Sequence, residues 1–424
     1  MRPLRLLVPV RAAFSALLVA GMIALPIPAL AVPLNVTPSL TLDQVYDSNV
    51  FNSDGNEKGD FILRATPSVA FSLITPEAAL NFSTYVSADK YYRYSELDKY
   101  DSSISLRLDS TTPIALTPRL RIAPNAYFVK TRDSFRRSQF LAQESTSGVV
   151  SSTSETGLHE SRVYGGGLGI YYTLTQNTEF FAGGNVNKLQ FLDNASLGYG
   201  YRSVSGTTSL SYKFTPVFAL GIFGTGSNND FESGDSSRIY AGGVTTSYAI
   251  ARRYTVEARV GTSRAEQELV GAPRRHFWSP YALLNLQYAA PDVQVGCTGM
   301  IAQSGLSSYG SITREESLSL KVSKQLKEYW WGDLNGMFQR NVSQDPVRDV
   351  NLTSVLGAGT IRYQLRKWVS LHLTGVYFQQ WSNGVSGQDL TRYSALVGIT
   401  VGNTYNLLGV ASAPPQNPLT INPQ

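Results

Sequence analysis

Apolar and polar residues alternate along the chain from residue 34 onward, a period of two that indicates β-strands with two different faces. In the first such segment, Leu34, Val36, Leu40 and Leu42 share one face, and short polar residues occupy the other. The same pattern returns after each turn signal, for example over 61–73, 104–109, 209–214, 369–374 and 393–402. The sequence therefore predicts an all-β protein.

The lengths of these segments and of their connections indicate which β architecture is formed. The predicted strands run for about 12 to 18 residues, longer than the usual 5 or 6 and long enough to cross a bilayer at a tilt. Short turns such as 176–177 alternate with longer polar loops, of which 134–159 is the longest. This alternation is typical of outer-membrane barrels rather than soluble sandwiches. It predicts a transmembrane antiparallel up-and-down β-barrel of about 18 strands (16 to 18).

Aromatic residues gather near the ends of the predicted strands, where an amphipathic ring is stable at the boundary between hydrocarbon and water. We expect them to form girdles around the barrel. They are Tyr91, Tyr92 and Tyr94 before one loop, Phe277 and Trp278 after another, and Tyr329, Trp330 and Trp331 after a short turn.

The first 31 residues have the features of a cleaved secretory signal. They carry Arg2, Arg5 and Arg11 with no acidic residue, then an apolar run that ends in Ala29-Leu30-Ala31. The alternative, a membrane anchor, is disfavoured by Pro26 and Pro28 within the run. We predict cleavage after Ala31 and a barrel over 32–408 in the outer membrane of a Gram-negative cell. A Pro-rich tail over 409–424 follows the barrel.

Composition excludes several classes of protein and indicates that the mature chain carries little net charge. With 11% aromatic residues, 16% charged residues and one cysteine, the chain is neither a disordered segment nor a disulfide scaffold. Without the signal, the chain has 33 basic and 31 acidic residues, which gives a formal charge of +2. Basic residues do not cluster beyond Arg136-Arg137 and Arg274-Arg275, so no nucleic-acid partner is expected.

Catalytic chemistry has little support in the sequence. The chain has only three histidines and lacks the GxSxG, HExxH and c-type haem motifs. A lipid-modifying enzyme could use His159 beside Glu160 and near Ser161, although a solvated loop histidine explains the same residues. We expect no enzyme activity, no metal site and no cofactor.

The polar strand faces are the candidate site, because a closed barrel of about 18 strands encloses a lumen too wide for side chains to fill. Basic residues on these faces would favour anionic solutes, and those near the short turns predict a basic ring. Alternatively, neighbouring acidic residues such as Asp43, Asp89, Asp109, Glu257 and Asp333 pair with them across the wall. The predicted basic lumen residues are Arg64, Arg107, Arg119, Arg121, Lys213, Arg259, Lys321 and Arg362.

The loop over 134–159 is the candidate constriction, because loops this long are commonly functional or disordered. It carries Arg136 and Arg137 near its start and is rich in serine and threonine. It either folds into the lumen or stands in the medium, and the sequence favours neither.

The segment from Val36 to Leu73 resembles the opening of the β-barrel porin 2 family. The matching residues are Tyr46-Asp47-Ser48-Asn49-Val50-Phe51, then Asp60-Phe61-Ile62 and Thr66-Pro67. The resemblance implies an outer-membrane barrel, often encoded with exopolysaccharide synthesis genes, that exports polymer. One departure is the C-terminus, because outer-membrane barrels commonly end in an aromatic strand residue, whereas this chain continues past Tyr405.

These observations predict an outer-membrane channel that passes exopolysaccharide or other polar or anionic solutes. A general diffusion porin and the barrel of a porin–cytochrome electron conduit are alternatives within the same class. The expected partners are outer-membrane lipid and lipopolysaccharide, together with periplasmic polysaccharide-export components or multihaem cytochromes.

Overall fold

The computed structural model describes residues 34–406 except for 76–77, 99–102, 134–157, 193–199, 306–311, 345–350 and 384–388. The predicted signal over 1–31, its cleavage site and the tail over 409–424 lie outside the described residues. In the described part of the chain, no helix is long and apolar enough to span a membrane.

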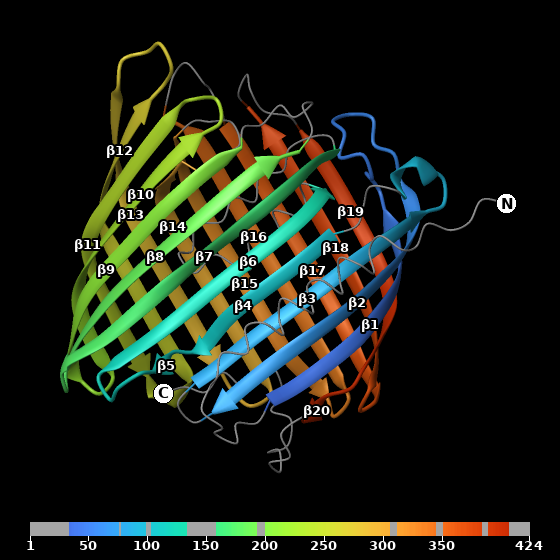
Figure 1. Cartoon of the computed structure of the whole chain (residues 1–424), viewed down its shortest axis with the longest axis horizontal. Helices are drawn as coiled ribbons and strands as arrows, with labels where there is room; N and C mark the ends of the chain where they lie inside the picture. Colours follow the sequence, from blue (N-terminus) through green and yellow to red (C-terminus); the bar gives the residue numbers. More distant parts are fainter. Residues whose placement is uncertain are drawn as a thin grey trace.

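The described chain forms one antiparallel sheet that closes into a barrel (Figure 1). The long strands contain 12 to 18 residues, as the alternating pattern predicts, except β4, which contains 10. They are β1 (Leu34–Asp47), β2 (Asp60–Thr75), β3 (Ala78–Tyr91), β4 (Ser103–Thr112), β6 (Leu120–Asp133), β7 (Leu158–Thr175), β8 (Thr178–Phe191), β9 (Tyr201–Thr215), β10 (Phe218–Phe231), β11 (Ser236–Ile250), β12 (Tyr254–Glu268), β13 (Arg275–Ala289), β14 (Val293–Ser304), β15 (Thr313–Lys327), β16 (Trp330–Ser343), β17 (Asn351–Arg366), β18 (Val369–Ser382) and β19 (Leu390–Gly402).

Two further strands of two residues complete the sheet. β5 (Ile114–Ala115) follows β4 along the same edge of β6, and Pro113 separates the two because proline cannot donate a hydrogen bond to the ladder. β20 (Tyr405–Asn406) pairs with the start of β1. The wall therefore has 18 strands, and the predicted fold class and strand number are confirmed.

The barrel closes because β1 pairs with β2 on one side and with β19 on the other. The closing register runs from Ser39 opposite Gly402 to Asp47 opposite Ser394. We call this β1–β19 contact the seam. In the described part of the chain, each long strand therefore pairs with a neighbour on both sides, as a β-structure in an apolar solvent requires.

The two ends of the barrel differ in their connections. At one end, the turn end, short turns such as 176–177, 216–217 and 367–368 join the strands. At the other end, the loop end, connections such as 48–59 and 134–157 are longer. Figure 1 shows the turn end at the bottom and the loop end at the top. The alternation predicted from the sequence is confirmed.

Large apolar side chains lie on the outside of the barrel and polar side chains on the inside. Ile222, Val260 and Leu373 on the outer face are 62%, 64% and 54% exposed. In contrast, Gln339 and Gln380 on the inner face are fully buried. A protein folded by water exclusion has the opposite distribution. The wall is therefore built for an apolar surrounding and a polar interior.

Strand alternation divides the predicted aromatic girdles between the two faces. Tyr92, Trp278 and Trp330 are exposed on the outside, as expected. Tyr91 is buried against Val45 and Ile62, and Phe277 packs beside buried Ile239 and Ala265, so the prediction that these two rings face the surroundings is wrong. The reason is that successive residues of a strand point to opposite faces.

Candidate functional site: the barrel lumen

The inner face changes from packed to open between the two ends of the barrel. On β15, Glu315 near the loop end is fully buried, whereas Lys321 nearer the turn end is exposed. On β9, Tyr201 and Ser203 are buried at the loop end and Lys213 is exposed at the turn end. The inner-face side chains are therefore packed mainly toward the loop end, and the lysines nearer the turn end are exposed.

Residues from the loops add to the packing at the loop end. Ile312, which precedes β15, is fully buried against the inner-face residues Ile239 and Ala265. Val50 and Leu97, from two other loops, pack in one buried cluster with inner-face side chains of β1, β2 and β3. The predicted constriction residues Arg136 and Arg137 lie outside the described residues, so their role stays a prediction.

Four of the predicted basic residues lie on the inner face and have an acidic neighbour. Two of the neutralised pairs join adjacent strands, one joins β6 to β8 across β7, and one forms within β12. They are Arg64 with Asp89 at 2.8 Å, Arg121 with Glu179 at 2.6 Å, Arg259 with Glu257 at 2.8 Å, and Arg362 with Asp333 at 3.8 Å. Glu179 is a partner that the sequence analysis did not predict. Its position on the polar face of the alternating pattern in β8 could have identified it.

The remaining predicted basic residues differ from these. Lys213 and Lys321 are exposed on the inner face and form no ion pair with any described residue. Arg119 is exposed in the turn that precedes β6, rather than on the strand itself. The backbone of Arg107 belongs to β4, but its side chain lies outside the described residues. A basic turn-end mouth would therefore depend on Arg119, Lys213 and Lys321.

Aromatic rings stand beside two of the inner arginines, a feature that sequence reasoning missed. The Arg121 guanidinium lies 5.4 Å from the ring centre of Tyr171, which contacts Phe181 at 4.8 Å. Arg259 lies 5.9 Å from the Phe223 ring, which contacts Tyr281 at 5.2 Å. These rings occupy positions where the alternation expects polar residues, and that break in the pattern was the detectable signal.

An electrostatic interaction links these two groups. The Tyr171 phenol interacts electrostatically with Arg121 and Glu179, and also with Glu257 and Arg259. β7 and β12 are separated in the wall by β8, β9, β10 and β11, so this second interaction crosses the lumen. We call the whole group the lumen cluster, which comprises Arg121, Tyr171, Glu179, Phe181, Phe223, Glu257, Arg259 and Tyr281.

The residues proposed for the enzyme alternative do not form a catalytic arrangement. His159 and Ser161 face inward from β7, whereas Glu160 faces outward and forms an ion pair with Lys130. Ser161 donates its hydroxyl hydrogen bond to the carbonyl of Thr131. Among the described residues, no three His, Cys, Asp or Glu side chains are grouped as metal ligands would be.

Three of the residues that carry the family resemblance, Asp47 to Asn49, lie at the loop end of the seam. Asp47 accepts hydrogen bonds from Arg392 of β19, with a closest approach of 2.6 Å, and both side chains are buried. Asn49 donates to the carbonyl of Thr391, and Ser48 exchanges two hydrogen bonds with Tyr393. The motif therefore has a structural role in this chain, which is to join the first strand to the last.

Comparisons with known proteins give likeness at the level of architecture. No family model and no curated protein matches the sequence, so membership of the β-barrel porin 2 family stays a prediction. Three crystal structures of similar barrels are those of Pseudomonas aeruginosa OccK2 (OpdF), the outer membrane protein OpdK of Pseudomonas aeruginosa, and a BenF-like porin of Pseudomonas fluorescens Pf-5.

The alignments cover most of each chain at very low identity. For OccK2 the identity is 10%, with 88% of this chain and 98% of that chain covered and a TM-score of 0.43. For OpdK and for the BenF-like porin the identity is 8%, with 87% and 99% covered and a TM-score of 0.41. These values are too low to transfer a function, so function is argued from the residues themselves.

Proposed function

We propose that this protein is an outer-membrane channel whose polar lumen passes hydrophilic solutes. The observation that carries the proposal is the inverted distribution of side chains, with large apolar residues exposed outside and amides and carboxylates buried inside. Such a wall is stable where hydrocarbon surrounds it, because closure of the sheet pairs the described strands with neighbours on both sides. The open turn end would then face the periplasm, where outer-membrane barrels have their short turns.

The lumen cluster supports a saccharide, and in particular an acidic polysaccharide, as the transported solute. Aromatic faces such as Tyr171 and Phe223 can pack against the C–H faces of sugar rings. Arg121 and Arg259 beside them present guanidinium groups that suit carboxylates. Their own partners Glu179 and Glu257 keep the cluster near neutral, so an acidic sugar would be held weakly and could move on.

The same geometry bears on the alternatives. A barrel that sheathes a multihaem cytochrome needs a lumen wide enough for a protein, whereas the described inner face is packed over its loop half. The packed loop half therefore favours solute passage over an electron conduit. Periplasmic polysaccharide-export components are the proposed partners, and they would meet the exposed turn-end residues Arg119, Lys213 and Lys321.

Planar-bilayer recording tests the channel. The purified barrel should give stepwise conductance, and the current should fall when an acidic oligosaccharide is added on the turn-end side. A neutral oligosaccharide of equal length should block less. Folding is verified by circular dichroism and heat-dependent gel mobility. A folded barrel that carries no current would contradict the proposal.

A paired variant experiment tests the role of the lumen cluster. Replacing both Arg121 and Arg259 with glutamine should weaken block by the acidic oligosaccharide at least tenfold, because each carboxylate loses a charge-assisted hydrogen bond. The control is Arg340→Gln, which removes an arginine from the outer face of β16. Equal block in both variants would remove the acidic-saccharide assignment and leave a general diffusion porin.

A further inference from the structure

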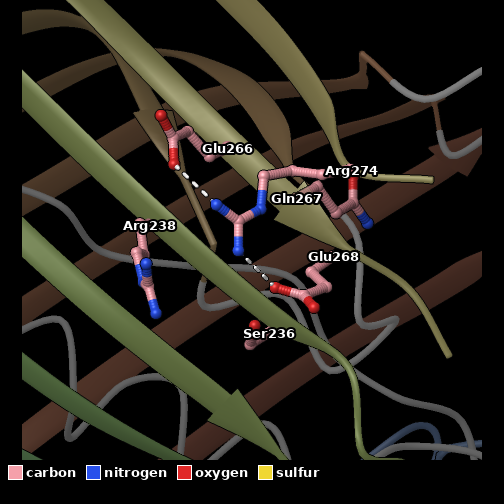
Figure 2. A pocket seen from close by; sticks show the side chains of 6 residues that line it. All are labelled: Ser236, Arg238, Glu266, Gln267, Glu268 and Arg274. Atoms are coloured by element: carbon pink, nitrogen blue, oxygen red, sulfur yellow. Dashed lines mark hydrogen bonds and ion pairs between the residues drawn. The ribbon is translucent and has the colours of Figure 1, made fainter.

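Basic side chains face outward near the loop end of several neighbouring strands, and several of them have a carboxylate partner. Lys130 pairs with Glu160 across β6 and β7, and Arg264 pairs with Glu266 within β12 at 2.9 Å. Figure 2 shows the same behaviour beside β12, where Arg274 pairs with Glu268 at 2.9 Å and approaches Glu266. The hydrogen bond to Glu268 also raises the pKa of the Arg274 guanidinium above its ordinary value.

Lys188 of β8 and Arg202 of β9 depart from this behaviour. They are register partners on adjacent strands, both face outward, and neither forms an ion pair with a described residue. Asp230 of β10 is the other register neighbour of Arg202, but its carboxylate accepts hydrogen bonds from Asn228 at 3.2 and 3.3 Å. The two cations are therefore adjacent and form no ion pair with a described residue, and the Asp230 carboxylate beside Arg202 offsets one of their two positive charges.

A third basic residue extends this positive patch. Arg162 of β7 faces outward beside β8 and hydrogen-bonds to the amide oxygen of Gln190 at 2.9 Å, which leaves its charge unneutralised. Set against Asp230, the three basic residues leave an excess of positive charge on the outer face at this height.

A groove opens on the outer face directly below the patch. Its lining is Tyr164, Gly165, Gly166, Val186, Lys188 and Arg202, and it encloses about 470 Å³. Lys188 and Arg202 lie at its loop-end side, whereas Tyr164, Gly166 and Val186 lie closer to the middle of the wall. The groove thus changes from cationic to apolar along the direction that crosses the membrane.

We propose that this groove binds one phosphate-bearing lipid of the membrane leaflet at the loop end. The lipid phosphate would accept hydrogen bonds from Lys188 and Arg202, with Arg162 adding attraction, and an acyl chain would lie against Tyr164 and Val186 over the space that Gly166 leaves open. The inference rests on the proposed function only in that the outer face must meet a membrane. We assign a phosphate group to this site, because several basic side chains together bind the compact negative charge of a phosphate best.

Native mass spectrometry of the full barrel in dodecyl maltoside micelles tests this site, with diphosphorylated lipid A as the probe. The wild-type barrel should retain one lipid A molecule at the lowest lipid concentrations. The double variant Lys188→Gln with Arg202→Gln should raise the apparent Kd by about tenfold to 30-fold, because each basic residue near a membrane surface contributes roughly a fivefold gain in binding of an anionic lipid.

The matched control is the double variant Lys324→Gln with Arg340→Gln, which removes two exposed outward cations from β15 and β16. It should bind lipid A as the wild type does. Equal binding by the Lys188/Arg202 variant, or equal loss in the control, would overturn the site. Inorganic phosphate, tested alone, should not bind at matching concentrations, and binding by it would assign the patch to a free anion instead.

Failure here is distinguishable from failure of the channel proposal. The Lys188/Arg202 variant keeps every lumen residue, so its bilayer conductance should equal that of the wild type. A barrel without conductance that still binds lipid A through these residues would contradict only the channel.

Discussion

Asp43 and His372 form a hydrogen bond of 2.8 Å across a strand that contributes no side chain between them. Asp43 lies on β1 and His372 on β18, and the residue opposite both is Gly398 of β19. Both side chains face the lumen and are largely buried. The pair therefore spans the seam, and it can do so only because position 398 lacks a Cβ atom.

Replacing Gly398 with alanine should weaken the seam. The added Cβ would overlap with the Asp43 carboxylate and the His372 ring. Loss of this hydrogen bond between buried polar groups is expected to cost about 1–3 kcal/mol of unfolding free energy. Urea-induced unfolding in lipid vesicles, followed by tryptophan fluorescence, measures it. The control is Gly375→Ala on β18, where a Cβ meets open space, and an equal loss there would contradict the account.

Arg392→Met should destabilise the barrel more than the loss of an exposed ion pair does. Both Arg392 and Asp47 are buried, so the substitution leaves the Asp47 carboxylate uncompensated, at a cost of about 3–5 kcal/mol. Arg314→Met is the comparison, because its pair with Glu316 is partly exposed and is worth about 0–1 kcal/mol. The same unfolding assay applies, and similar losses in the two variants would show that the seam pair has no special role.

Replacing Arg119 and Arg121 with serine should reduce any preference for anions. Replacing Arg121 leaves Glu179 without its partner, and replacing Arg119 removes an exposed positive charge at the turn end. Both changes make the lumen more negative, so the reversal potential in a salt gradient should shift toward cation preference. An unchanged reversal potential would show that these residues do not set the selectivity.

Ile222→Lys should prevent stable insertion in a bilayer. Ile222 is on the outer face of β10, and a lysine near the bilayer midplane costs about 2–4 kcal/mol. Asn335→Lys is the control, because Asn335 is exposed on the inner face of β16. Folding yield into vesicles should fall only for Ile222→Lys. If both variants fold equally well, the outer face does not meet hydrocarbon.

The alternation of side chains along each strand allowed much of the candidate site to be predicted from the sequence. Arg64, Arg121, Arg259 and Arg362 lie on the inner face because alternation sets a side chain's face once the strand is placed. Their partners were only partly predictable. Asp89 and Asp333 stand on neighbouring strands, and finding them needs the register, whereas the electrostatic interaction of Tyr171 with Glu257 depends on the curvature of the whole wall.

The sequence by itself determined the alternation, the strand lengths and the unequal connections, and these were sufficient for an 18-strand barrel with an apolar exterior. The tertiary structure decided what alternation cannot encode. It placed Asp43 beside His372, which are 329 positions apart in the chain, and it directed Ile312 inward over the lumen. The physical reason is that period two fixes the face of each residue, whereas closure and register fix which residues meet.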